Sequence, residues 1–329
     1  MASRVPGVLM LFVYNSDNGK LSPADPAAPI ENAIWLDLCK ATPEEEARVL
    51  PLVPEIPSLA DMEEIEISAR LYREGAFDFL TVLVPGLNDD KQPFSGPVTF
   101  ILNTDRLVTV RHHTPRPFET YAPRADKMGL GCERPERVFL GLVEEIIGRL
   151  ADLMEGAGRA LDSVTHSVFH PGQMGHNADF LQSSLETAGR QGDLVSHCRL
   201  SLLTLERALG FFLLAPEDRA VSEPARPLVA GLLRDISSLE VHGDYLSSRV
   251  AQATDATLGM INLAQNTTVR IVSVVAVLFL PPTLIASIYG MNFHVMPELA
   301  WVAGYPMAMG LMVASAAATY LFFKRKNWL

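Results

Sequence analysis

Charge is almost missing from the last 61 residues of the chain. The only acidic residue there is Glu298, against four basic residues: Arg270, Lys324, Arg325 and Lys326. Because the 329-residue chain carries −11, this end contributes +3 and residues 1–268 contribute −14. The acidic part lacks the basic surface that nucleic-acid binding needs, which excludes nucleic acid as a partner. Its charge favours attraction of cations instead.

Cysteine is scarce too, and no catalytic motif is present. The three cysteines, Cys39, Cys132 and Cys198, are odd in number, widely spaced and form no C-x-x-C pair. This excludes a disulfide framework, and we expect free thiols in a reducing compartment. A glycine-rich phosphate loop and a nucleophile elbow are also missing. We therefore expect a protein that is not an enzyme and has no cofactor.

Histidine gives no clear metal site. His166 and His170 are spaced i, i+4, as two zinc ligands on one helix face would be. No acid or cysteine completes the set at a fixed spacing, and Pro171-Gly172 breaks the helix pattern. His112 and His113 follow an expected strand and are interpreted as the start of a loop. We expect no zinc site and no chemical role for these side chains.

Two long runs contain no charged residue. Residues 271–288 read IVSVVAVLFLPPTLIASI, and residues 307–323 read MAMGLMVASAAATYLFF. Each approaches the roughly 20 residues that cross a bilayer. Two buried core helices of a soluble protein are the alternative, but core helices rarely run this far without charge. The runs therefore predict two membrane-spanning helices.

The basic residues that flank these runs predict the topology. Arg270 precedes the first run and Lys324-Arg325-Lys326 follows the second, whereas the loop between them has no Lys or Arg. Positive charge stays on the cytoplasmic side, so both termini are expected in the cytoplasm and the loop outside. We expect a multi-pass protein of the cell (inner) membrane, in contact with the lipid bilayer, with its acidic part in the cytosol.

The order of patterns predicts the domains. Short apolar strands are expected at 6–14, 33–38, 77–84, 98–103 and 107–111, and helices at Thr42 and Ser58. Residues 1–132 should form a cytosolic α/β or α+β domain, followed by antiparallel cytosolic helices over 133–226. A stalk helix over 227–291 should continue into the first span at about 269–289. The outer loop over 292–300, the second span over 301–323 and a basic tail over 324–329 complete the expected order.

A narrow stripe of small and polar side chains follows the stalk and the first span. Its members recur every three or four residues, which places them on one helix face. They are Asn262, Asn266, Val269, Ser273, Ala276, Leu280, Thr283 and Ser287. The stripe fits either a water-filled pore or a packing face between helices. Because two spans cannot enclose a channel, a pore requires a symmetric homo-oligomer.

A distinctive motif follows the first span. Tyr289-Gly290-Met291-Asn292-Phe293 comes directly after it, and Met296-Pro297-Glu298-Leu299 lies in the loop. Pro281-Pro282-Thr283 lies within the first span, and Gly304-Tyr305-Pro306 opens the second. With its basic tail, the sequence resembles the CorA family of magnesium transporters, whose signature is Gly-Met-Asn between two spans. The motif match covers residues 260–329, and the order of domains extends the resemblance over the whole chain.

The resemblance implies a funnel-shaped homopentamer that conducts divalent cations. Mg²⁺ is the expected main substrate, with Co²⁺ and Ni²⁺ as further substrates, and cytosolic Mg²⁺ is the expected gating ligand. Gly290, Met291 and Asn292 take the role of the selectivity filter. Mg²⁺ loses water reluctantly. A ring of Asn292 carbonyl groups, with the Gly290 backbone carbonyl, therefore suits a hydrated ion.

Other side chains are assigned to the pathway by position. Thr283 presents a hydroxyl ring behind the filter. Leu280, Val272 and Val269 are expected to form apolar constrictions that gate by dewetting. The lining is completed by Ala276 and by Asn266 at the cytosolic mouth, and either Val272 or Ser273 faces the axis.

Acidic residues outside the spans are candidates for regulation. Asp255 occupies a position that carries a regulatory acid in some family members, and Asp89 or Asp90 is its candidate partner across a subunit interface. Ordinary surface acids are the alternative for each. Glu298 keeps one negative charge in the outer loop. His294 stands where family members frequently have an acid.

Two rival functions remain at this point. One is a Zn²⁺ transporter of the related ZntB branch, which tends to carry a different residue in the middle of the tripeptide, so Met291 argues against it. The other is a membrane-anchored cation sensor that does not conduct. The sensor hypothesis leaves the Pro281-Pro282 pair and the Gly-Met-Asn motif unexplained.

Overall fold

The computed structural model describes residues 10–17, 19–25, 27, 29–87, 93–127, 131–170, 178–214, 225–291, 296–297 and 301–326. The chain forms two compact units. The first comprises Met1–Val164 and Glu186–Ala253, and the second comprises Thr165–Leu185 and Thr254–Leu329.

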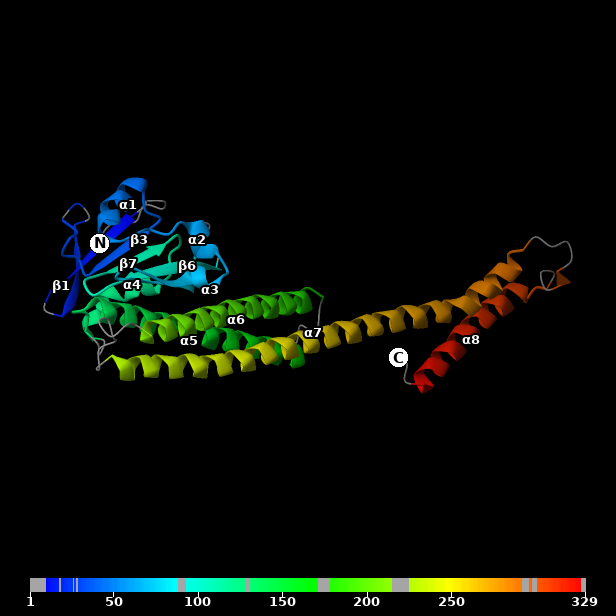
Figure 1. The fold of residues 1–329 in the computed structure, drawn as a ribbon. Coiled ribbons are helices and arrows are strands. Elements are labelled where there is room, and N and C mark those ends of the chain that lie inside the picture. The colour runs from blue at the N-terminus through cyan, green and yellow to red at the C-terminus, as the bar shows by residue number, and fades with distance from the viewer. Residues whose placement is uncertain are drawn as a thin grey trace. The chain divides into compact units, whose positions relative to one another are not determined.

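A seven-stranded sheet is the centre of the first unit (Figure 1). Its strands are β1 (Met10–Asp17), β2 (Lys20–Ala24), β3 (Trp35–Cys39), β4 (Leu71–Glu74), β5 (Phe77–Leu87), β6 (Pro93–Leu102) and β7 (Leu107–Arg111). The order across the sheet is β2-β1-β3-β7-β6-β5-β4. Only the β3–β7 pair is parallel, and the other five pairs are antiparallel. Of the two expected descriptions, α+β fits this sheet.

Both faces of the sheet are buried, because the central strands alternate two kinds of side chain. In β3, Leu36 and Leu38 point to one face and Trp35 and Asp37 to the other, and all four are buried. The first face carries the apolar core that α1 (Pro43–Val49) and α2 (Leu59–Glu63) help to close. Both helices begin with a capping box, at Thr42 and Ser58 as the sequence predicts.

The second face contains a buried ion pair. Arg111 on β7 holds Asp37 on β3 through two hydrogen bonds, Nη2 to Oδ2 at 2.8 Å and Nε to Oδ1 at 3.0 Å. Thr109 donates to Asp37 at 2.8 Å and accepts from the Trp35 indole at 3.0 Å. Parallel pairing of β3 with β7 brings these side chains together. The pair is fully hydrogen-bonded, as buried charges must be.

Three long helices continue the first unit. They are α5 (Pro135–Phe169), α6 (Ala178–Leu213) and α7 (Arg226–Tyr289), after the short α3 (Ile67–Arg70) and α4 (Pro117–Thr120). Phe139 of α5 packs edge-on against Phe100 of the sheet at 5.2 Å and against Phe212 of α6 at 5.2 Å. Arg199 of α6 pairs with Asp244 of α7 at 2.7 Å. Aromatic packing near the sheet and ion pairs along the helices therefore hold this part together.

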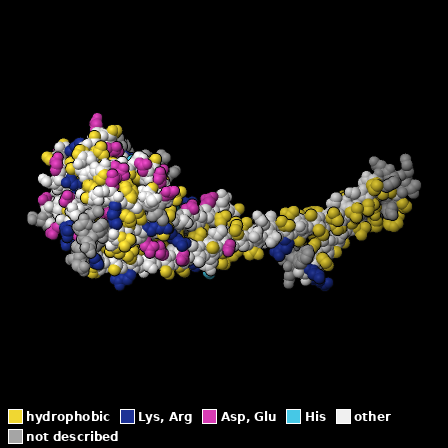
Figure 2. Space-filling view, viewed as in Figure 1, with side chains coloured by type: hydrophobic (Ala, Val, Ile, Leu, Met, Phe, Trp, Pro, Cys, Tyr) yellow, Lys and Arg dark blue, Asp and Glu magenta, His cyan; other side chains and the backbone are white. Residues whose placement is uncertain are grey.

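The second unit contains the two most apolar helices of the structure. Helix α7 has 64 residues, about 95 Å at 1.5 Å per residue, and its second half, from Thr254 onward, belongs to this unit. Helix α8 covers Gly304–Arg325. By length and composition both can cross a bilayer. Apolar side chains cover the surface of this pair in Figure 2. The domain boundaries expected from sequence stay predictions.

Candidate functional site

One face of α7 is covered by α8. The covered positions are Val274, Leu278, Pro281, Ile285 and Tyr289, which are buried or half-buried and follow one another at spacings of three and four. Val274 is 6% exposed. On α8, Gly304, Ala308 and Phe323 are buried and Met312, Ser315 and Thr319 are half-buried, again at spacings of three and four. This pattern is that of two helices packed along one face each.

Most of the residues expected to line a pore lie on the face of α7 that α8 leaves uncovered, and Val269 lies at the border of this face because it also lines a groove beside α8. Val269, Val272 and Leu280 are 64%, 63% and 68% exposed. Ala276 and Thr283 are exposed as well. Relative to Val274, a rotation of 100° per residue places these five side chains on the far side of the helix. Apolar residues left this exposed by their own chain need another partner, either lipid or further copies of the helix.

Ser273 takes a different place from Val272. It lines a groove with Val274 and Phe323, beside α8. Val272 lies farther from α8, since it is 160° from Val274 on the helix whereas Ser273 is 100° away. This geometry favours Val272 over Ser273 as the member of the uncovered face.

Two prolines lie inside α7 without ending it. Pro281 and Pro282 have no N–H, so the carbonyl groups of Val277 and Leu278 lack their usual helical donors. Proline is tolerated in membrane helices where neighbouring groups satisfy the freed carbonyls. The pair, which directly precedes Thr283, therefore leaves backbone polarity in an otherwise apolar segment.

Hydroxyl groups of α7 are satisfied by their own helix. The Thr283 hydroxyl donates to the Phe279 carbonyl at 2.7 Å, and Ser273 donates to Val269 at 2.8 Å. A hydroxyl that donates to the backbone keeps lone pairs that accept hydrogen bonds. Water in the hydration shell of a cation donates such bonds. Thr283 is therefore suited to contact a hydrated cation without losing its helical bond.

Helix α7 ends at Tyr289, directly before the glycine that the sequence assigns to the filter. The Gly290 N–H donates to the Ala286 carbonyl at 2.9 Å, and the Met291 N–H donates to the Ile288 carbonyl at 3.3 Å. A Cβ atom on Gly290 would lie 3.1 Å from the Ala286 oxygen, which is tighter than ordinary contact. Glycine at this position avoids a tight contact with the preceding turn. Met291 is 47% exposed.

The remaining predicted site residues fall into two groups, those outside the described residues and those on exposed parts of α7. Asn292, His294, Glu298, Asp89 and Asp90 lie outside the described residues. Asp255 lies on α7 in the second unit and is exposed. Asn266 is exposed and lines the same groove as Ser273, beside Arg270.

The structure assembles no metal site from the histidines and cysteines that it describes. Across the described ranges, no three or more His, Cys, Asp or Glu side chains form a group able to hold a metal ion. His166 and His170 stack with ring centroids 4.8 Å apart. The three cysteines are free thiols, and burial raises the pKa of Cys198 to about 12.

His113 is a buried side chain rather than a solvated loop residue. It lies between two glycines of the β5–β6 hairpin. A Cβ atom on Gly86 or Gly96 would come within 2.7 Å or 2.9 Å of its ring. Its Nε2 lies 2.8 Å from the Val84 carbonyl. Burial lowers its pKa to about 4, so the ring is neutral at physiological pH.

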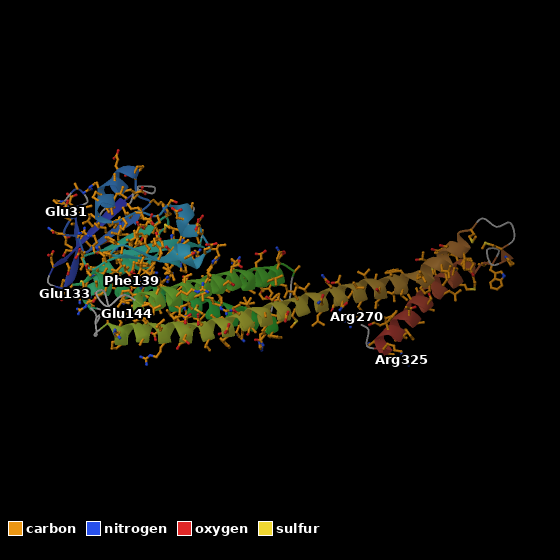
Figure 3. All side chains as sticks on the ribbon, in the orientation of Figure 1. Glu31, Glu133, Phe139, Glu144, Arg270 and Arg325 are labelled. Carbon is orange, nitrogen blue, oxygen red and sulfur yellow. The ribbon has the colours of Figure 1, made fainter. Side chains whose placement is uncertain are left out.

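A cavity of about 410 Å³ in the first unit carries balanced charge. Its charged lining consists of Arg116, Arg124, Arg149, Glu144, Glu145 and Asp152. Glu145 already accepts from Thr120 and Arg124, at 2.7 Å and 3.1 Å. Burial, with Asp235 and Glu145 nearby, raises the pKa of Glu144, which Figure 3 labels. Three cationic and three anionic side chains leave no excess charge to select a cation.

The chain folds into an α+β body, and helix α7 runs from this body into an apolar segment that pairs with α8. This arrangement is that of membrane proteins with two spans and a large folded N-terminal domain. Comparisons with known proteins specify the family. The family model described as CorA-like Mg²⁺ transporter protein matches residues 31–325. The chain belongs to this family.

Individual relatives are similar in sequence to this chain over almost its full length. The magnesium transport protein CorA of Escherichia coli is 34% identical over 327 residues, covering 97% of this chain and 100% of the relative. The CorA protein of Mannheimia succiniciproducens is 34% identical with the same coverage. In fold, the chain resembles the CorA magnesium transporter of Methanocaldococcus jannaschii, with TM-score 0.73 and 17% identity over 98% of this chain and 99% of that one.

The cytoplasmic domain of ZntB from Vibrio parahaemolyticus shares the fold as well, with TM-score 0.56 and 10% identity over 77% of this chain and 98% of that one. The fold alone therefore does not separate the two branches. Family membership confirms the expectation of a transporter rather than an enzyme.

Proposed function

We propose that this protein mediates influx of Mg²⁺ as a channel formed by several copies of the chain. Membership of a Mg²⁺ transporter family supports the substrate. The observation that carries the channel is the uncovered face of α7, opposite the face that α8 covers. A ring of copies, each turning this face inward, encloses a path that a single chain cannot enclose. By family resemblance the ring is a homopentamer.

The ion passes hydrated through a sequence of rings. Asn266 forms the cytosolic mouth, and Thr283 lies near the outer end. Asn292, which follows Gly290 and Met291 in the sequence, contacts the water shell through its carbonyl group. Neutral carbonyl groups suit this role because carboxylates at the same place would bind Mg²⁺ directly and slow its release.

Apolar rings close the path. Val269, Val272 and Leu280 are large enough to expel water from a narrow channel, which stops a hydrated ion. Ala276 between them leaves more room. Opening then requires only a small widening of the ring. Membrane potential drives the ion inward, at about 4.6 kcal/mol per 100 mV for a double charge.

Both termini lie in the cytoplasm, and the protein resides in the inner membrane. The positive residues at the ends of the two spans support this orientation. Glu298 in the outer loop attracts cations to the mouth. Cytosolic Mg²⁺ bound by Asp255 with Asp89 or Asp90 of a neighbouring copy holds the ring closed, and its loss releases repulsion among these acids.

Cation uptake into liposomes that contain the purified protein tests the proposal. Wild type and Asn292→Ala are compared for Mg²⁺, Co²⁺, Ni²⁺ and Zn²⁺, with and without a pH gradient. We expect potential-driven Mg²⁺ entry that ignores the pH gradient and changes in rate or ion preference in the variant. Asn32→Ala, in the body and far along the chain from the spans, is the matched control.

The same experiment separates the rivals. Zn²⁺ entry that follows the proton gradient, without Mg²⁺ entry, moves the chain to the ZntB-like function. If folded protein takes up none of the four cations, the result favours the cation sensor. Co²⁺ and Ni²⁺ entry alongside Mg²⁺ establishes the wider substrate range.

A further inference from the structure

A groove of about 320 Å³ lies between α7 and α8, near the end of α8. It is lined by Asn266, Val269, Arg270, Ser273, Val274, Val277 and Phe323. Val274 and Phe323 are its most buried members, at 6% and 7% exposure. The wall is mainly aliphatic and aromatic, and the one charged side chain in it is Arg270. The groove thus combines an apolar channel with a cationic group.

More positive charge stands at the same end of the helix pair. Lys324, Arg325 and Lys326 follow Phe323 directly, and all three are exposed, as is Arg270. Figure 3 shows Arg270 and Arg325 at the same end of the pair. The sequence from 256 to 297 and from 299 to 329 contains no Asp or Glu to neutralise them. Within the described residues, none of the four cations has a carboxylate at ion-pair distance.

We propose that this groove binds an anionic phospholipid of the cytoplasmic leaflet. Arg270 and the basic tail hold the phosphate, because guanidinium and ammonium groups bind phosphate oxygens with charge-assisted hydrogen bonds. One acyl chain lies along Val274, Val277 and Phe323. The inference rests on the proposed function only for the placement of the two helices in a membrane. Basic pockets between spans on the cytoplasmic side are a recurrent type of site for anionic headgroups.

Charge decides between a lipid and a second copy of the chain as the occupant. A second copy would bring the same four cations to the same depth and no acid from its own spans, so like charges would face each other. An anionic lipid brings the opposite charge. In a ring of subunits it also neutralises part of the positive charge that the ring concentrates at one level of the membrane.

Lipid titration of the purified full-length protein in detergent, read by native mass spectrometry, tests the site. The probes are phosphatidylglycerol, phosphatidylcholine and water-soluble glycerol phosphate. We expect phosphatidylglycerol to be retained in preference to phosphatidylcholine, and glycerol phosphate not to displace it. Arg270→Gln should lower the affinity for phosphatidylglycerol about 5-fold, and the double variant Arg270→Gln with Arg325→Gln should lower it about 25-fold. Phosphatidylcholine binding should not change.

Two matched controls separate the groove from general effects. Arg234→Gln removes one exposed positive charge from the same helix, far along the chain from the groove, and should leave lipid retention unchanged. Val277→Trp fills the groove and should reduce phosphatidylglycerol retention about 10-fold. Val275→Trp adds the same bulk on another side of α7, where it does not line the groove, and should not. Circular dichroism and oligomer size verify that each variant folds.

Specific results overturn the proposal. They are equal retention of the two lipids, displacement by glycerol phosphate, or an unchanged preference in folded Arg270→Gln protein. Val277→Trp that breaks the oligomer without changing lipid retention assigns the groove to a second copy instead. Liposome Mg²⁺ uptake is measured on the same preparations. Intact lipid preference without uptake overturns the transport function alone, and uptake without lipid preference overturns this site alone.

Discussion

The α+β body and the α7–α8 pair treat apolar side chains in opposite ways. In the body, Trp35, Phe79 and Phe100 are fully buried by the chain itself. In the pair, Phe279 and Leu280 are 60% and 68% exposed. Apolar surface in the first region is removed from water by folding of one chain. In the second region it must be covered by lipid or by other copies.

Charge shows the same contrast. The body contains a charged pair in its interior, Asp37 with Arg111, and satisfies it with hydrogen bonds. From residue 269 onward, the two helices keep their charged residues, Arg270 and Lys324 to Lys326, at one end of the pair. A body can bury ions only when they are paired, whereas a bilayer disfavours them at any place except its edges. The following predictions test this contrast, beginning with the largest effect.

Removal of Asp37 should destabilise the body most. Asp37→Ala leaves the Arg111 guanidinium buried without its carboxylate, and we expect a loss of about 3–5 kcal/mol in unfolding free energy. Denaturant unfolding followed by tryptophan fluorescence measures it. Asp244→Ala breaks an exposed pair with Arg199 and should cost about 0–1 kcal/mol. Equal losses in the two variants would contradict the structural role of the buried pair.

An aspartate placed on the two faces of α7 should have unequal effects. Val274→Asp puts a charge into the covered face against α8, at a cost of about 3 kcal/mol, and should abolish assembled protein in membranes. Val272→Asp puts it on the uncovered face. If that face lines water, the variant should still assemble. The yield of detergent-extracted oligomer distinguishes them, and equal loss of both would mean that the uncovered face contacts lipid or protein.

Acidification should destabilise the body through His113. Its folded pKa is about 4 and its ordinary value 6.5. Between these values only the unfolded chain binds the proton. The contribution of neutral His113 to the unfolding free energy is therefore complete above pH 6.5 and is lost as pH falls toward 4. The loss reaches about 3 kcal/mol.

Unfolding free energies at pH 7 and pH 4.5 measure this slope. His113→Gln keeps a donor for the Val84 carbonyl but does not titrate, so it should remove that part of the slope. A slope that is the same in this variant would assign the acid sensitivity to other groups.

Loss of the Thr283 hydroxyl should give the smallest effect, and only on transport. Thr283→Val removes one acceptor for the water shell, which is worth about 1 kcal/mol, so Mg²⁺ flux into liposomes should fall roughly 5-fold. Thr319→Val makes the same change on α8, where the hydroxyl donates to Ser315 at 3.0 Å. It should leave flux unchanged, and a similar fall in both would remove the special role of Thr283.

Much of the fold follows from local pattern. The strands expected at 33–38, 77–84, 98–103 and 107–111 are confirmed as β3, β5, β6 and β7 with small shifts of their ends. Helix α5 (Pro135–Phe169) lies within 133–226, where the sequence predicts helices. Strands β2 and β4 escaped prediction, because both are short, lie at the sheet edges and bury little. Edge strands carry a weak hydrophobic signal.

The candidate site was only partly predictable. The stripe on α7 and the motif at its end follow from spacing and from the family resemblance. The groove beside Arg270 could not be predicted, because one of its walls is Phe323. This residue is 53 residues from Arg270 in the sequence and reaches α7 only through packing of α8. The burial of His113 was also missed, because the two glycines that enclose it lie in another hairpin.

The sequence by itself determined the two spans, the long helix between body and membrane, and the family motif. Each of these depends on residues that are close together along the chain. Only the tertiary structure decided which face of α7 is covered, how Asp37 meets Arg111, and where a groove remains between the spans. These features depend on contacts between distant segments, and a pattern of spacing does not specify which segments meet.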